Sequence, residues 1–88
     1  MKSFSVSIVT PEKTVYQGEA VSLIVPAARG YLGILADHAP LIANLTAGKI
    51  ILRKDGSQAA TTFYSKGKGF LEVLKNNVIL FLDFAGDN

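Results

Sequence analysis

Apolar and polar residues alternate near the start of the chain. Phe4, Val6 and Ile8 would share one side of an extended segment, and the serines between them would share the other. A two-residue period of this kind is typical of a strand with one buried face. The chain therefore opens with a predicted strand.

Turn-forming residues punctuate the next segment. Residues 10–12 predict a turn, and residues 14–16 predict a short strand that Gly18 ends. Residues 20–25 alternate again and predict another strand, which Pro26 stops because proline cannot donate to a ladder.

Two hairpins are predicted in the second half of the chain. Residues 49–54 and 58–64 flank Asp55-Gly56, a pair that favours the positive φ angles of a tight hairpin turn. Residues 69–73 and 78–82 flank Asn76-Asn77, and asparagine tolerates left-handed geometry.

No stretch shows the apolar spacing of an amphipathic helix, and the best attempt, residues 32–45, is interrupted by Gly33 and Pro40. Many short strands between regular turns predict an all-β fold, a sandwich or flattened barrel. A chain of 88 residues is long enough for one core and too short for two. We therefore expect residues 1–88 to form a single β-sandwich domain.

Hydrophobic residues make up 49% of the chain and charged residues 18%. This composition excludes a disordered, highly charged protein and indicates an apolar surface that favours a partner. The absence of cysteine excludes disulfides and fits a reducing compartment. The longest apolar runs are far shorter than the roughly 20 residues that span a bilayer, and no signal peptide is evident. No transmembrane segment is expected.

His38 is the only histidine and the first candidate for chemistry. As a general base it would need a nucleophile to activate, and the chain has no nucleophile motif. As a metal ligand it would need two or three further ligands, and the chain has no other histidine and no cysteine. Asp37 is adjacent, but neighbours along an extended chain point to opposite faces. We expect the His38 ring to bond backbone groups in a turn, with Ala39 held extended by Pro40. No catalytic residue, metal site or cofactor is predicted.

Residues 64–73 support an alternative function, because aromatic, basic and glycine residues interleave there in a predicted strand. Small β-barrels bind single-stranded nucleic acid by stacking bases on aromatic residues beside basic ones. The residues that would do so are Tyr64, Lys66, Lys68 and Phe70. The net charge of +2 is small for such a module, and both rings also suit a core.

Residues 50–52 and 78–82 are apolar on both faces of their predicted strands. Strands of this kind are either central in a sandwich or part of an exposed docking patch. The sequence leaves both interpretations open.

Three motifs carry a resemblance to a known family. Gly30-x-Leu32-Gly33-Ile34-x-x-x-His38-Ala39-Pro40-Leu41 is followed by Gly48-x-Ile50 and then by Gly69-Phe70-Leu71-Glu72-Val73. With the opening stretch SIVTPEKTVYQGEAVSLIVPAARG, they resemble the N-terminal domain of the epsilon subunit of F-type ATP synthases over nearly the whole chain. Within these motifs, Gly33, Pro40, Gly48 and Gly69 are expected to have a structural role rather than to contact a partner.

The resemblance implies a β-sandwich of about ten short strands and a non-catalytic subunit of the central stalk. In this family the domain docks the gamma subunit to the c-ring and couples proton flow to ATP synthesis. The implied partners are gamma and the c-ring, with no nucleic acid and no cofactor. The implied location is peripheral, on the cytoplasmic face of the bacterial inner membrane. The residues implied to face the ring are Ala28, Arg29, Gly30, Tyr31, Asp37 and His38.

The chain departs from the family pattern in three places. The family often has an acidic residue at Tyr31 and Pro-Gly at Ala36-Asp37, so we expect Asp37 to supply negative charge toward the ring. Family members also usually continue into two inhibitory helices, whereas this sequence stops at Asn88. If it is complete, we expect no C-terminal helical domain, no self-inhibition and no nucleotide sensing.

Overall fold

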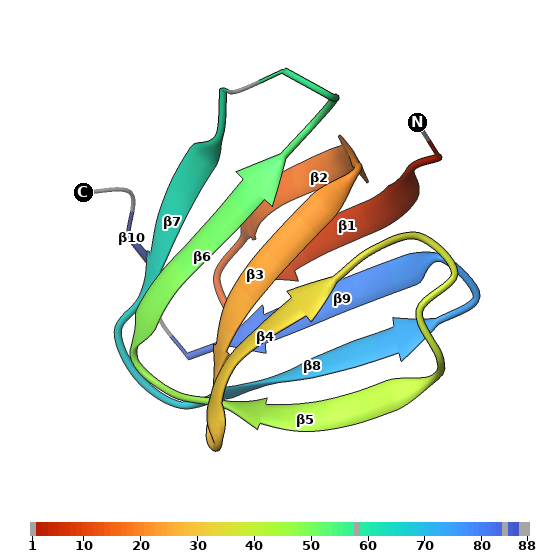
Figure 1. Cartoon of the computed structure of the whole chain (residues 1–88). Coiled ribbons are helices and arrows are strands. Elements are labelled where there is room, and N and C mark those ends of the chain that lie inside the picture. The colour runs from red at the N-terminus through yellow and green to blue at the C-terminus, as the bar shows by residue number, and fades with distance from the viewer. Residues whose placement is uncertain (1, 58, 84, 87–88) are drawn as a thin grey trace.

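The computed structural model describes residues 2–57, 59–83 and 85–86, which form strands, turns and connections (Figure 1). The described strands are β1 Phe4–Val9, β2 Thr14–Ala20, β3 Ser22–Ala27, β4 Gly30–Ile34, β5 Leu41–Leu45, β6 Gly48–Arg53, β7 Thr61–Ser65, β8 Gly69–Leu74, β9 Asn77–Leu82 and β10 Ala85–Gly86. Within these ranges, no helix has the length and apolarity needed to cross a membrane. The predicted all-β class is confirmed.

Hydrogen bonds join the strands into one curled sheet in the order β10-β7-β6-β3-β5-β8-β9-β1-β2, with β4 paired to β3. The sheet folds over where β3 meets β5 through a single residue pair, Ala27 with Leu45. One layer contains β3, β4, β6, β7 and β10, and the other contains β1, β2, β5, β8 and β9 (Figure 1). β1 and β9 run parallel, and every other pair of described strands is antiparallel.

The core lies between the two layers, and buried apolar side chains of both layers form it. Phe4, Val6 and Ile8 of β1 are buried, as their spacing predicts, and each contributes about 1.5–3 kcal/mol through its removal from water. Tyr16 of β2 packs on Phe63 of β7, with ring centroids 5.7 Å apart. The layers therefore face each other as a sandwich.

β2 and β3 continue past the residues that were predicted to end them. β2 runs through Gly18, which pairs with Val6 of β1. β3 runs through Pro26, which pairs with Tyr31 of β4, while its carbonyl oxygen accepts a hydrogen bond from the Thr46 amide (2.8 Å). Proline lacks the donor but keeps the acceptor, so it fits a strand position where only the acceptor is used.

The first predicted hairpin exists, but its turn is longer than predicted. β6 and β7 pair in antiparallel register up to Leu52 with Thr61, so Asp55-Gly56 lies inside a connection rather than forming a two-residue turn. The Ser57 amide donates to Asp55 Oδ1 (2.9 Å) within that connection. Gln58, the predicted first residue of the second strand, lies outside the described residues.

The second predicted hairpin also exists, with its turn one residue earlier than predicted. β8 and β9 pair Leu74 with Asn77, which leaves Lys75 and Asn76 as the two turn residues. Their φ angles are 51° and 61°, the left-handed values that suit the twist of a tight hairpin.

Candidate functional site

The residues predicted to face the ring lie toward the two ends of β4. Residues 28 and 29 form the turn between β3 and β4, and residues 30 and 31 begin β4. Asp37 and His38 lie beyond the other end of β4, in the connection to β5. The five residues of β4 rise about 3.3 Å each, so roughly 15 Å of strand separates the two groups. The structure keeps residues 28–31 together and separates them from Asp37 and His38.

The β3–β4 turn is attached to the strands beside it. The Ala28 amide donates to the Asn44 carbonyl oxygen (2.9 Å), and the Lys49 amide donates to the Tyr31 hydroxyl (3.1 Å). The Tyr31 ring nevertheless remains 61% exposed, and Arg29 is exposed beside it. This end of the molecule presents an aromatic ring and a cation on a fixed backbone.

Gly48 allows Tyr31 to take that position. A Cβ at Gly48 would lie 2.7 Å from Pro26 Cβ and 2.8 Å from the Tyr31 hydroxyl oxygen, and its φ of 154° disfavours other residues. Gly33 differs, because a Cβ there would meet nothing within 4 Å. Close packing therefore explains why residue 48 is glycine, and no such contact explains Gly33. Pro40, another residue of the motif, is exposed.

The imidazole of His38 contacts backbone, as predicted. Its Nδ1 lies 2.7 Å from the Ala39 carbonyl oxygen, which can only accept, so Nδ1 carries a proton. The His38 amide donates to the Leu35 carbonyl oxygen (3.3 Å). These contacts make His38 a residue that shapes the β4–β5 connection.

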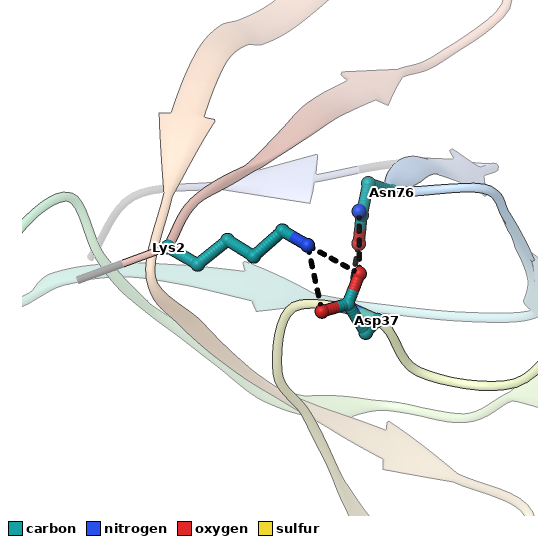
Figure 2. A network of polar contacts seen from close by, with 3 residues as sticks. All are labelled: Lys2, Asp37 and Asn76. Carbon is teal, nitrogen blue, oxygen red and sulfur yellow. Dashed lines mark hydrogen bonds and ion pairs between the residues drawn. The ribbon is translucent and has the colours of Figure 1, made fainter.

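Asp37 adopts a left-handed conformation, with φ 66°. Lys2 Nζ donates to both carboxylate oxygens (2.9 and 2.8 Å), and Asn76 Nδ2 donates to Oδ1 (3.0 Å) (Figure 2). The Asp37 amide in turn donates to Asn76 Oδ1 (2.6 Å). Hydrogen bonds from Lys2 and then from Asn76 lower the pKa of Asp37 below its ordinary value of 3.8. Lys2 and Asn76 carried no functional prediction from the sequence.

The second surface of interest is the outward side of β5, β8 and β9, which we call the outer face. Register places Ile42, Glu72 and Ile79 in one row across it, and Asn44, Phe70 and Phe81 in the next. Six large apolar side chains are exposed among the described residues, and four of them lie here. Their exposed fractions are 72% for Ile42, 49% for Leu74, 44% for Phe70 and 36% for Phe81.

Two features shape the outer face. Phe70 and Phe81 stack with centroids 4.6 Å apart and planes 20° from parallel. A shallow groove between β5 and β8 is lined by Pro40, Ile42 and Leu74, among others. Since Pro40 follows His38 closely in the chain, the connection that holds Asp37 and His38 adjoins this groove. The outer face therefore combines apolar rings with an apolar hollow.

The structure does not form the aromatic platform of the nucleic-acid alternative. Residues 64–73 are two strands rather than one, because β7 ends at Ser65 and β8 begins at Gly69. Tyr64 on β7 and Phe70 on β8 are separated in the sheet by β6, β3 and β5. Of the described residues, no three or more His, Cys, Asp or Glu gather into a group that could hold a metal ion.

Comparison with known proteins places the chain in a family. A sequence model described as "ATP synthase, Delta/Epsilon chain, beta-sandwich domain" matches residues 3–86. The chain belongs to this family. The resemblance found in the sequence is confirmed.

Relatives of this delta/epsilon chain are named ATP synthase epsilon chain. That of Moorella thermoacetica is 42% identical over 85 residues, which cover 97% of this chain and 62% of that one. That of Chlorobaculum tepidum is 40% identical over 82 residues, which cover 93% of this chain and 91% of that one. The chain thus spans about three fifths of the length of the first three curated relatives: 62%, 60% and 59%.

Solved structures share the fold at low sequence identity. A chain in the Euglena gracilis mitochondrial ATP synthase, in a structure titled with OSCP, F1 and the c-ring, superimposes with a TM-score of 0.85 at 16% identity. The match covers 94% of this chain and 52% of that one. A chain in the Tetrahymena thermophila mitochondrial central stalk and c-ring gives 0.79, also at 16% identity, and covers 98% of this chain and 67% of that one.

Proposed function

We propose that this chain is a non-catalytic central-stalk subunit of a proton-translocating F-type ATP synthase. It docks the gamma subunit to the c-ring, so that rotation of the ring reaches gamma and proton flow is coupled to ATP synthesis. Membership of the delta/epsilon family and relatives named epsilon chain support this proposal. The chain would then be a peripheral component of the complex on the cytoplasmic face of a bacterial inner membrane.

The observation that carries the proposal is the outer face of β5, β8 and β9. Four exposed apolar side chains gather there on paired strands. Interfaces draw most of their energy from a few apolar or aromatic side chains that become fully desolvated at the centre. The stacked Phe70–Phe81 pair and Ile42 suit that role. We assign gamma to this face.

The c-ring is assigned to the β3–β4 turn. Residues 28–31 form a compact end with Arg29 and Tyr31 exposed, which suits the polar loops of a ring. Asp37 and His38 lie beyond the other end of β4 and adjoin the groove of the outer face. The two partners therefore occupy different parts of the sandwich.

Size-exclusion chromatography of the purified chain mixed with gamma from the same source tests the proposal. A one-to-one complex that persists at moderate salt is expected, because apolar contacts are weakly screened. A parallel mixture with single-stranded oligonucleotide should show no shift. No complex with gamma, together with an oligonucleotide shift that weakens steeply with salt, would replace the proposal by the nucleic-acid alternative.

A further inference from the structure

Three segments that are distant in sequence meet at Asp37. Lys2 precedes β1, Asp37 lies between β4 and β5, and Asn76 is in the turn between β8 and β9. Figure 2 shows the Lys2 ammonium and the Asn76 amide converging on the Asp37 carboxylate. The Ser5 amide also donates to the Asn76 carbonyl oxygen (2.9 Å), so β1 and the turn are tied together independently. The β4–β5 connection is fastened to that assembly through Asp37.

The backbone at Asp37 gives a reason for this fastening. A φ of 66° lies in the left-handed region, which residues other than glycine adopt rarely and which aspartate and asparagine tolerate better than most. A residue other than glycine keeps such a conformation only where contacts with its surroundings hold it. In this chain two side chains and one backbone amide share the task.

We infer that Asp37 is a positioning residue that fixes the β4–β5 connection beside the groove of the outer face, with its charge already paired to Lys2. This inference rests on the proposed docking of gamma to the outer face. The connection carries His38 and leads to Pro40, which lines the groove with Ile42 and Leu74. A loop held in one shape before binding loses less conformational freedom when its partner arrives. Asp37 therefore acts on the partner through the loop and not by offering a charge.

Amide hydrogen exchange of the isolated chain tests the fastening without any partner. Lys2→Met removes the ammonium, and Asp37→Gly removes all side-chain contacts while keeping the left-handed backbone accessible. Both variants should speed exchange at the His38 amide by about three- to tenfold, since that bond then opens more often. Lys2→Arg should restore wild-type exchange, and Asp55→Asn, a charge removal in the β6–β7 connection, should leave it unchanged. Unchanged exchange in Lys2→Met and Asp37→Gly would overturn the inference.

Binding to gamma separates positioning from charge donation. If Asp37 positions the loop, Lys2→Met and Asp37→Asn should both raise the dissociation rate, by about threefold. If Asp37 instead offers its charge to the partner, Lys2→Met should bind more tightly and Asp37→Asn more weakly, which would refute the inference. A third outcome separates the two claims. If the variants exchange faster but the wild-type chain does not bind gamma, the role of Asp37 in holding the loop is supported and the proposed function is refuted.

Discussion

Replacing Ile42 by lysine is expected to weaken binding to gamma by about 30- to 150-fold, or roughly 2–3 kcal/mol, in isothermal titration calorimetry. Ile42 is the most exposed large apolar side chain among the described residues, at 72%. The substitution removes apolar contact and places an ammonium group where the partner excludes water. The fold should tolerate it, because residue 42 lies opposite Glu72 on β8 and the new charge faces an acidic one.

A matched control introduces the same charge elsewhere. Ala60→Lys places a lysine at an exposed position before β7, in the other layer. It should leave the affinity for gamma within about twofold of wild type, since rim or distant charges have small effects on affinity. Equal affinities for the Ile42→Lys and Ala60→Lys variants would show that gamma does not bind the outer face.

Replacing Gly69 by alanine is expected to lower the free energy of unfolding by about 3 kcal/mol, measured by urea denaturation. A Cβ at Gly69 would press on the Phe81 carbonyl oxygen and lie 3.0 Å from Leu82 Cδ2. Gly69 pairs with both Leu45 and Leu82, so its backbone is held between two strands and the contact cannot be relieved by a side-chain rotation.

Gly33→Ala provides the comparison for Gly69→Ala. Both glycines lie in strands, but an added Cβ at Gly33 would have nothing within 4 Å. Its unfolding free energy should stay within about 0.5 kcal/mol of wild type. Similar urea midpoints for the two variants would mean that the close approach of β8 and β9 does not constrain Gly69.

The alternation of apolar residues was enough to predict β1. The second hairpin was predicted from two β-rich runs on either side of a turn, and the structure places that turn one residue earlier. It was insufficient for β4 and β5, where no strand was predicted. Gly30, Gly33 and Pro40 interrupt or flank that region, and pairing with β3 and β8 overrides such local signals. The parallel pairing of β1 with β9 joins residues far apart in the chain, which local patterns do not encode.

The candidate surfaces likewise combine features that local sequence patterns predict with features that depend on strand pairing. The interpretation of residues 78–82 as a central strand is confirmed, since β9 lies between β8 and β1. Phe81 of the same strand is exposed, and a docking patch there stays a prediction. That Phe81 stacks on Phe70 depends on hairpin register. The contact of Lys2 with Asp37 spans 35 residues and has no local signature. Sequence therefore indicates which residues are available, while pairing decides which of them meet.

The most direct test of the central claim is ATP-driven proton pumping, measured beside ATP hydrolysis, in membrane vesicles whose synthase lacks this chain. If the chain docks gamma to the c-ring, adding it should raise the protons pumped per ATP hydrolysed, and the Ile42→Lys variant at the same concentration should restore much less. Full pumping without the chain, or no change on adding it, would contradict the account.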